Sequence, residues 1–279
     1  MSEESGIRKQ DDKKSVEEAS KLPTRLIYEV IRRDGDEELE RPVSSLLWSG
    51  IAAGLMISFS VLGEAVFRAR LPDQPWRVLV ENLGYSLGFL LVILGRMQLF
   101  TENTIKTVLP LMARPDLHLF RRVLRLWSIV LAANVVGAFV AAAFFAYTAA
   151  LPASLLPAIE ELSRHAVMTP PAEGFARAIP AGILIAAIVW MGPQAKASEF
   201  FTVLAFTWLI AAGDFTHIVA GSVEMAYLAL NGVVGFGQAA FGFFLPVLAG
   251  NIVGGTAIFT LLAWGQVREE LAAKARSET

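Results

Sequence analysis

The sequence GDFTHIVAG, residues 213–221, interrupts an apolar segment that is otherwise ready to cross a bilayer. The run before it, residues 200–212, carries no charge but is too short to span about 30 Å at about 1.5 Å per residue. A glycine, an acid, an aromatic, a hydroxyl and a histidine then follow, and apolar residues resume almost at once. A polar interruption at membrane depth is tolerated only where the backbone lines a cavity or is buried in protein. The stretch therefore predicts a broken transmembrane helix with His217 at the break.

The composition is that of a helical membrane protein. Of the 279 residues, 54% are hydrophobic and 18% are charged, the mean hydropathy is +0.52, and the charges lie mostly in the tails and a few short loops. The chain has no cysteine, which excludes disulfides, thiol catalysis and cysteine metal sites. A nucleic-acid partner is not expected, because no basic patch with interleaved aromatic residues occurs. About forty residues of mixed charge precede the first apolar run, so a signal peptide is not expected.

Six apolar elements predict an all-α polytopic membrane protein with six transmembrane helices. They cover approximately residues 43–67, 79–95, 126–151, 178–193, 200–228 and 239–267. The second element is cut short by Arg96, and the fifth is the broken one. A small helical piece is expected near residues 159–165, in the loop between the third and fourth elements. These boundaries define an N-terminal tail (residues 1–42), a channel domain (43–267) and a C-terminal tail (268–279).

The N-terminal tail begins with polar, charged residues 1–20, which are expected to be disordered. Residues 23–33 read as a short amphipathic helix that ends at Asp34-Gly35. Such a helix lies either on the membrane face or against the protein, and a partner-binding role is the alternative.

Lysine and arginine gather on one side of the predicted membrane, and this asymmetry orients the chain. They cluster between the second and third elements and again after the sixth, whereas the loop between the fifth and sixth elements has none. Both termini are therefore expected in the cytoplasm, in a bacterial inner (plasma) membrane. Three arginines in the first outer loop oppose this orientation without reversing it: Arg68, Arg70 and Arg77.

The two halves of the chain share short motifs. ANVVGA (residues 133–138) matches GNIVGG (250–255), and FTE (100–102) matches FTH (215–217). Three helices in each half give an inverted repeat, and interrupted helices at matching positions of such halves indicate a binding site at the midplane. The Asn-x-x-Gly motifs have an expected structural role, because small residues let helices approach closely.

Each break is expected to be followed by a short helix, over about residues 103–111 and 218–228, whose N-terminal end points into the protein. Asp214 or Thr216 could cap the second of these helices. Positive helix ends at a dry midplane favour an anion, or a polar solute with acceptor oxygens.

These residues resemble the formate/nitrite transporter family, which are pentameric channels with an aquaporin-like fold. The resemblance covers all six elements, roughly residues 46–264. The motifs that carry it are YSLGF (85–89), LFT (99–101), residues 127–137, GIL (182–184), WM (190–191), Phe215-x-His217 and residues 245–255. The resemblance implies an inverted 3+3 repeat with broken second and fifth helices, a homopentamer in the bilayer, and a separate pore in each protomer.

The resemblance also implies site residues. His217 would be the central pore histidine, and Thr101 the hydroxyl where the second helix breaks. Four bulky residues would form two apolar constrictions: Tyr85, Phe89, Phe100 and Ile210. Each has an alternative, because His217 can be a helix–helix hydrogen-bond partner, Thr101 a helix cap, and the bulky residues ordinary packing.

The sequence departs from the family pattern near the pore. No lysine occurs between residues 165 and 174, where many members carry a vestibule lysine, and Glu173 is the one formal charge in that stretch. Thr216 replaces a usual glutamate and Gly221 a usual asparagine. Arg96 and Glu102 add charges, and these two are expected to pair with each other, although Glu102 could instead contact the substrate.

The predicted function is a channel or transporter for small monovalent anions such as formate, nitrite or a short carboxylate. Desolvation favours a neutral imidazole at His217, which can donate a hydrogen bond to an anion or transfer a proton to it. The alternatives are a pore for neutral or cationic solutes, selected by Glu173, and a non-conducting membrane scaffold. An intramembrane enzyme is not expected, because a nucleophile–base pair or a metal-ligand set is not evident, and no cofactor or metal is predicted.

Overall fold

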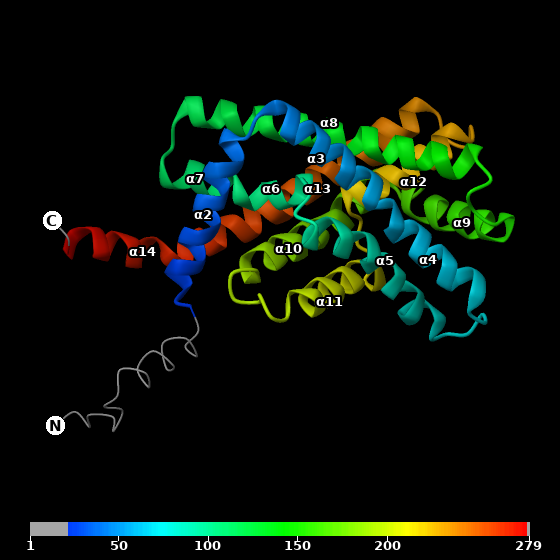
Figure 1. Cartoon of the computed structure of the whole chain (residues 1–279), viewed down its shortest axis with the longest axis horizontal. Helices are drawn as coiled ribbons and strands as arrows, with labels where there is room; N and C mark the ends of the chain where they lie inside the picture. Colours follow the sequence, from blue (N-terminus) through cyan, green and yellow to red (C-terminus); the bar gives the residue numbers. More distant parts are fainter. Residues whose placement is uncertain (1–21, 278–279) are drawn as a thin grey trace, which may run out of the picture.

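The computed structural model describes residues 22–277, and this part of the chain consists of helices joined by turns (Figure 1). The expected disorder of residues 1–20 lies outside the described residues. The helices in chain order are α2 (Thr24–Glu40), α3 (Val43–Met56), α4 (Ser58–Arg70), α5 (Arg77–Leu94), α6 (Phe100–Lys106), α7 (Val108–Ala113), α8 (Leu117–Tyr147), η1 (Ala153–Leu155), α9 (Leu156–Val167), α10 (Pro171–Met191), α11 (Glu199–Ala212), α12 (Ile218–Leu230), η2 (Gln238–Phe244), α13 (Leu245–Ile252), η3 (Val253–Thr260) and α14 (Leu261–Ser277).

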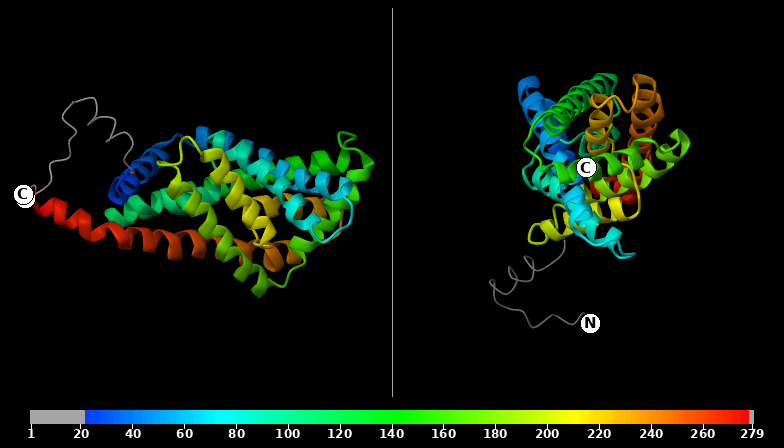
Figure 2. Two further views of the ribbon diagram at one scale, coloured as in Figure 1. Left: turned by 90° about the horizontal axis from the view of Figure 1, so that it is seen from below. Right: turned by 90° about the vertical axis from the view of Figure 1, so that its right-hand side faces the viewer.

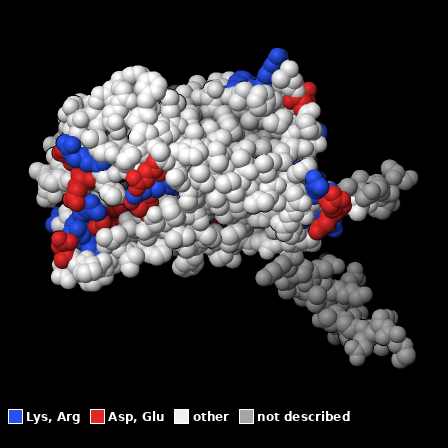
Figure 3. Space-filling model, turned by 180° about the vertical axis from the view of Figure 1, so that it is seen from behind, with Lys and Arg blue, Asp and Glu red and all other residues white. Residues whose placement is uncertain are grey.

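The predicted transmembrane elements are confirmed. Within the described residues, five helical segments are long and apolar enough to cross a membrane: Val43–Arg70, Arg77–Leu94, Leu117–Tyr147, Pro171–Met191 and Gln238–Glu270. The remaining element, the fifth, is the expected broken one, made of the two shorter apolar helices α11 and α12. One face of the molecule shows charges gathered at both ends and a broad uncharged band between them (Figure 3). This pattern is that of a protein whose middle lies in hydrocarbon.

Two helix pairs pack closely, one in each half of the repeat. The α3–α8 pair brings Gly137 against the backbone of α3, where an added Cβ would lie 2.3 Å from the Ile51 carbonyl oxygen. In the other half, α10 packs against the continuous segment α13–η3. This brings Gly254 against α10, where an added Cβ would lie 2.1 Å from the Ile179 carbonyl oxygen. The glycine of each Asn-x-x-Gly motif is therefore required by the close approach of two helices.

Helix α2 is longer than the sequence indicates, because Gly35 does not end it. The helix runs from Thr24 to Glu40, and a Cβ on Gly35 would lie 1.9 Å from the carbonyl oxygen of Lys106. The glycine is thus a point of close contact with α6, not a stop. Ile31 is buried against Ile105 and neighbouring apolar residues, so the helix lies against the protein.

Helices α2 and α14 contact each other and lie at the same end of the bundle, whereas α4 and α9 reach the opposite end (Figures 1 and 2). The third element also starts earlier than expected. Helix α8 begins at Leu117, because the Asp116 side chain caps it by accepting a hydrogen bond of 3.0 Å from the Leu119 amide. The basic segment before the apolar run is therefore part of the same helix.

Candidate functional site

Two helix breaks with the same backbone geometry meet in the middle of the bundle. Gly95 is the C-cap residue of helix α5, and Gly213 is the C-cap residue of helix α11. The residue after each glycine, Arg96 or Asp214, has a positive φ of 52° or 55°. Non-glycine residues pay about 1 kcal/mol or more in this left-handed region, so the surrounding structure must hold both turns in place.

Asn134 holds the first break. Its Oδ1 accepts a hydrogen bond of 2.9 Å from the amide of Phe100, the first residue of α6. Its Nδ2 donates to the carbonyl oxygens of Gln98 and Gly50, both at 2.8 Å. The side chain is fully buried. It therefore satisfies backbone groups of the broken segment that water cannot reach at this depth.

Asn251 holds the second break in the same way. Its Oδ1 accepts a hydrogen bond of 2.8 Å from the amide of Ile218, the first residue of α12. Its Nδ2 donates to the carbonyl oxygens of Ala178 at 2.8 Å and Thr216 at 3.0 Å. The asparagines of the two motifs are thus equivalent anchors, one for each half.

These anchors correct the register of the internal repeat. They align Phe100 with Ile218, and hence Leu99 with His217. The sequence match that pairs Phe100 with Phe215 is therefore wrong by three residues. The first half places a leucine where the second half places the imidazole, so the site is asymmetric.

His217 is the N-cap residue of α12, so the expectation that Asp214 or Thr216 caps this helix is wrong. Its Nδ1 accepts a hydrogen bond of 3.3 Å from the Ala220 amide. Its Nε2 lies 2.7 Å from Thr101 Oγ1, and each of these two residues is 1% exposed. Because Nδ1 is an acceptor, the ring proton is on Nε2 and is donated to the threonine. The Thr101 hydroxyl proton is then free to point at a third group.

Two aromatic side chains lie against the imidazole in series. The ring of Phe89 meets that of His217 edge-on, with centroids 4.9 Å apart. Tyr85 follows with its centroid 5.2 Å from that of Phe89. The structure therefore brings Tyr85, Phe89, Thr101 and His217 together from α5, α6 and the start of α12.

The other two expected constriction residues have different surroundings. Phe100 is buried with its ring edge-on to Trp127, at a centroid distance of 5.6 Å. Ile210 is fully buried, and its carbonyl oxygen accepts a hydrogen bond of 2.9 Å from the Phe215 amide. The pore-lining role of these two residues stays a prediction.

A cavity of about 60 Å³, which we call the acid cavity, opens beside the imidazole toward α9. Its lining residues are Glu64, Tyr85, Leu162, His165, Ala166, Thr169, Ala211, Asp214, Phe215, Thr216, His217 and Glu224. Sequence reasoning did not connect Glu64 and Glu224 with the site. The available signal was that each is an acid inside an apolar transmembrane segment, where ionisable groups are usually functional.

Glu173 is not among the residues that line the acid cavity. It is hydrogen-bonded to Arg177, and Arg177 also bonds to Asp214. His165 Nε2 lies 2.8 Å from the other carboxylate oxygen of Asp214. The charge of Glu173 is therefore compensated locally, which weakens its expected influence on the pore.

On the opposite side of the break, Glu102 pairs with Lys106, so the expected pairing of Glu102 with Arg96 is wrong. The two residues are one helical turn apart on α6, which puts them on one face. Gln98 extends the polar contacts by donating a hydrogen bond of 2.6 Å to Glu38 on α2. This side of the candidate site therefore carries paired charges.

Gly221, which departs from the family pattern, has a packing reason. A Cβ at this position would lie 2.4 Å from the ring of Phe243. A larger side chain does not fit at this position against the phenylalanine ring.

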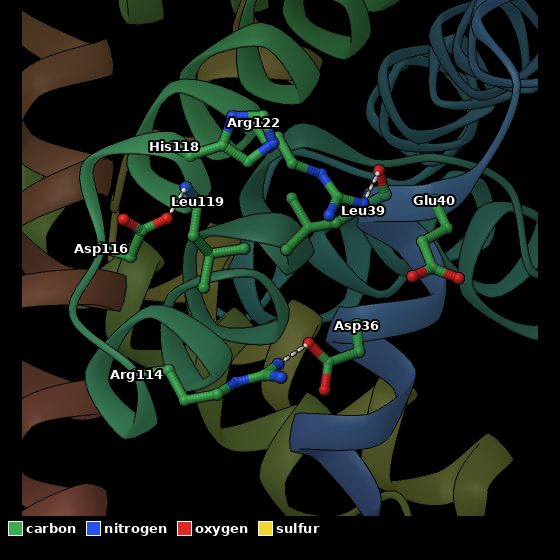
Figure 4. A pocket seen from close by; sticks show the side chains of 8 residues that line it. All are labelled: Asp36, Leu39, Glu40, Arg114, Asp116, His118, Leu119 and Arg122. Carbon is green, nitrogen blue, oxygen red and sulfur yellow. Dashed lines mark hydrogen bonds and ion pairs between the residues drawn. The ribbon is translucent and has the colours of Figure 1, made fainter.

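A larger hollow of about 390 Å³ lies between α2 and the start of α8 (Figure 4). It is bordered by the ion pair of Arg114 with Asp36, at 2.5 Å, and by the hydrogen bond of Arg122 to the Leu39 carbonyl, at 3.0 Å. None of the residues around His217 lines it. Its polar contacts attach α2 to the bundle, and it is separate from the candidate pore.

Comparison with known proteins finds one matching family model and several similar proteins. A family model described as formate/nitrite transporter matches residues 25–265. The inner membrane protein YfdC of Escherichia coli is 43% identical over 272 residues, which are 97% of this chain and 88% of that protein. The formate channel FocA of Haemophilus influenzae is 28% identical over 188 residues, 65% of each chain.

Solved structures share the fold. A pentameric formate channel with formate bound superposes with a TM-score of 0.71 at 21% identity, over 81% of this chain and 97% of the other. An FNT family ion channel superposes with a TM-score of 0.73 at 17% identity, over 86% and 98% of the two chains.

Proposed function

We propose, since the chain belongs to the formate/nitrite transporter family, that it is a transmembrane channel or transporter for small monovalent anions such as formate or nitrite. The transport is proton-linked at His217. The observation that carries this proposal is the contact of 2.7 Å between His217 Nε2 and Thr101 Oγ1, which joins the two broken helices at the centre of the bundle.

The two side chains supply donors to a passing anion. His217 offers its Nε2–H and Thr101 its hydroxyl proton, and the start of α12 adds the partial positive charge of a helix N-terminus. A solute oxygen that replaces the histidine–threonine contact receives donors from both. These donors offset part of the cost of removing an anion from water.

A proton can also pass through the ring. When Nδ1 takes up a proton, it gives up the hydrogen bond from the Ala220 amide, and Nε2 can then transfer its own proton to an anion oxygen. The ring ends neutral, and the solute crosses as the undissociated acid. This route avoids a bare charge at the centre of the membrane.

The proposal extends to assembly and orientation. The protein is a homopentamer in a bacterial inner membrane, with one pore in each protomer and both termini in the cytoplasm. In support, α2 and α14 lie at one end of the bundle, a relative is an inner membrane protein, and a structural neighbour is pentameric. The acid cavity then lies on the outer side of His217.

A pore for neutral or cationic solutes is the second candidate. It is favoured by the acids around the acid cavity, Glu64, Asp214 and Glu224, where no lysine contributes to the lining. Glu173→Lys separates the candidates. If this substitution creates formate permeation that the parent protein lacks, the second candidate is preferred.

Flux through proteoliposomes tests the function. His217→Ala removes the Nε2 donor and is expected to lower formate or nitrite uptake about tenfold or more, because a hydrogen bond to a charged group contributes about 1.5–3 kcal/mol. His118→Ala, on the rim of the separate hollow, is the matched control and should transport like the parent. A His217→Ala protein that transports as well as the parent would falsify the mechanism.

A further inference from the structure

Glu64 on α4 and Glu224 on α12 are buried acids to which the proposed function gives no role. They are 9% and 8% exposed, and both line the acid cavity together with His217. Among the contacts of residues 22–277, neither carboxyl group has a hydrogen bond or an ion pair. Two unpartnered carboxyl groups therefore face one small space beside the pore histidine.

Other buried acids of this protein have cations at hand. Glu81, 1% exposed, takes hydrogen bonds of 2.6 and 3.3 Å from the Arg68 guanidinium. Arg68, one helical turn from Glu64 on α4, is thus bound to another acid. Glu102 has Lys106 on the same face of its helix. The lack of a partner at Glu64 and Glu224 is therefore particular to the acid cavity.

A carboxyl group out of water costs least when it carries a proton or has a cation beside it. Two ionised carboxylates around one cavity would also repel each other. Asp214, the third acid in the lining, is already bonded to Arg177 and His165. Glu64 and Glu224 are therefore the acids of this cavity that still need a compensating positive charge.

A proton fits this space better than a metal ion. Hard metal cations take six or more oxygen ligands, whereas much of this lining is carbon, from residues such as Leu162, Ala166 and Phe215. In the described part of the chain, no three acids or histidines are placed to hold a metal ion.

The groups that face the two carboxyls from the surrounding helices are also known. They are Arg68 on α4, Glu81 and Tyr85 on α5, His165 on α9, and Asp214 and His217 at the second break, and Arg177 on α10 stands behind Asp214. The arginines in this set are each hydrogen-bonded to another acid, Arg68 to Glu81 and Arg177 to Asp214. None of them is free to neutralise the pair by direct contact.

We propose that Glu64 and Glu224 form the proton entry site of the pore. The two carboxyl groups hold a proton at the outer end of the pore and transfer it to the substrate. The proposal rests on the proposed function and adds to His217 a second proton donor, which acts on the anion before the anion reaches the imidazole. In the step, the O–H bond of one carboxyl breaks as an oxygen of the incoming anion takes the proton. The carboxylate left behind is reprotonated from the outer solution. A free anion is repelled while the pair is ionised and admitted when it is protonated.

Infrared spectroscopy of the purified, lipid-reconstituted full chain tests the site without any transport. At neutral pH the parent should show the carbonyl band of a protonated carboxylic acid, and the double variant Glu64→Gln, Glu224→Gln should lack it. Glu160→Gln, an exposed acid on α9 paired with Arg164, is the matched control and should retain the band. A parent without the band, or a double variant that keeps it, overturns the proposal.

Formate uptake into proteoliposomes at a series of outer pH values tests the role. Parent uptake should rise as the outer pH falls, and the double glutamine variant should lose about a hundredfold in rate and its dependence on outer pH, since general acids contribute about 10²–10⁴-fold. Glu64→Asp, Glu224→Asp keeps the acids and should restore the pH dependence if the fold is intact. An unchanged pH profile in the glutamine variant, or a pair that binds K⁺ in place of a proton, overturns the proposal. A parent that moves no formate or nitrite contradicts the proposed function alone, because the infrared band still decides the proton site.

Discussion

The two helix breaks have the same backbone and different chemistry. In each, an asparagine from a neighbouring helix binds the first amide of the resumed helix and a carbonyl of the broken segment. The first break then carries Leu99 and a nearby paired Glu102, whereas the second carries His217 and faces two unpaired acids. The asparagine anchors therefore build the scaffold, and the N-cap residue of the resumed helix, Leu99 or His217, can differ between the two halves. Two breaks with equivalent backbone hydrogen bonds can therefore carry different side-chain chemistry.

The largest expected effect comes from breaking the anchors. Asn251→Ala removes three hydrogen bonds and leaves the amide of Ile218 and the carbonyl oxygen of Thr216 unpaired, whereas the Ala178 carbonyl keeps its place in helix α10. At about 1–3 kcal/mol for each unsatisfied group, we expect a loss of at least about 2 kcal/mol. Asn134→Ala should cost a similar amount, because it makes the same contacts.

Thermal unfolding of the purified protein, together with its assembly by size-exclusion chromatography, measures these losses. Asn231→Ala, at the end of α12 with a single backbone contact, is the control and should change little. If one anchor variant is strongly destabilised and the other is as stable as the parent, the equivalence of the two breaks is wrong.

An intermediate effect is expected where the halves touch. Thr101→Val keeps the shape of the side chain but removes the hydroxyl that accepts from His217 Nε2. We expect formate or nitrite flux to fall about tenfold, corresponding to about 1.4 kcal/mol, with assembly unchanged.

Thr202→Val, at a partly exposed position of α11, is the matched control for the loss of a hydroxyl. Initial uptake rates in proteoliposomes provide the comparison. Equal rates for Thr101→Val and the parent would show that this hydroxyl serves only to hold the fold.

The smallest effect concerns the left-handed residues. Arg96→Gly should stabilise the protein by up to about 1 kcal/mol, because glycine adopts the positive φ of this position without a steric cost. Asp214→Gly should gain less or lose stability, because it also breaks the contacts with Arg177 and His165. The difference in melting temperature between the two variants measures how much the contacts of Asp214 with Arg177 and His165 stabilise the second break. A larger gain at position 214 than at position 96 would contradict this account.

The sequence contained enough to predict the fold and to single out two residues of the candidate site. The interruption at residues 213–221 cannot be a simple span, and the Asn-x-x-Gly motifs mark the close helix pairs in both halves. Thr101 and His217 followed from the resemblance, and the structure brings them within 2.7 Å.

What could not be predicted depends on contacts between distant segments. The repeat register follows from which amide each asparagine binds, and the chance likeness of FTE and FTH concealed it. Gly35 is a helix breaker by local propensity, but in the fold it is a contact with Lys106. Glu64 and Glu224 are far apart in the chain, and no local pattern places them around the same cavity.

The cap on α12 has one more consequence. The ring nitrogen that caps this helix belongs to the same imidazole that we propose to meet the solute, so one side chain both fixes the start of the helix and supplies the proposed donor. Each change in the charge of the ring loosens or fastens the first turn of the helix. The charge of the imidazole and the width of the proposed pore beside this first turn then change together, so a measurement of one also reports the other.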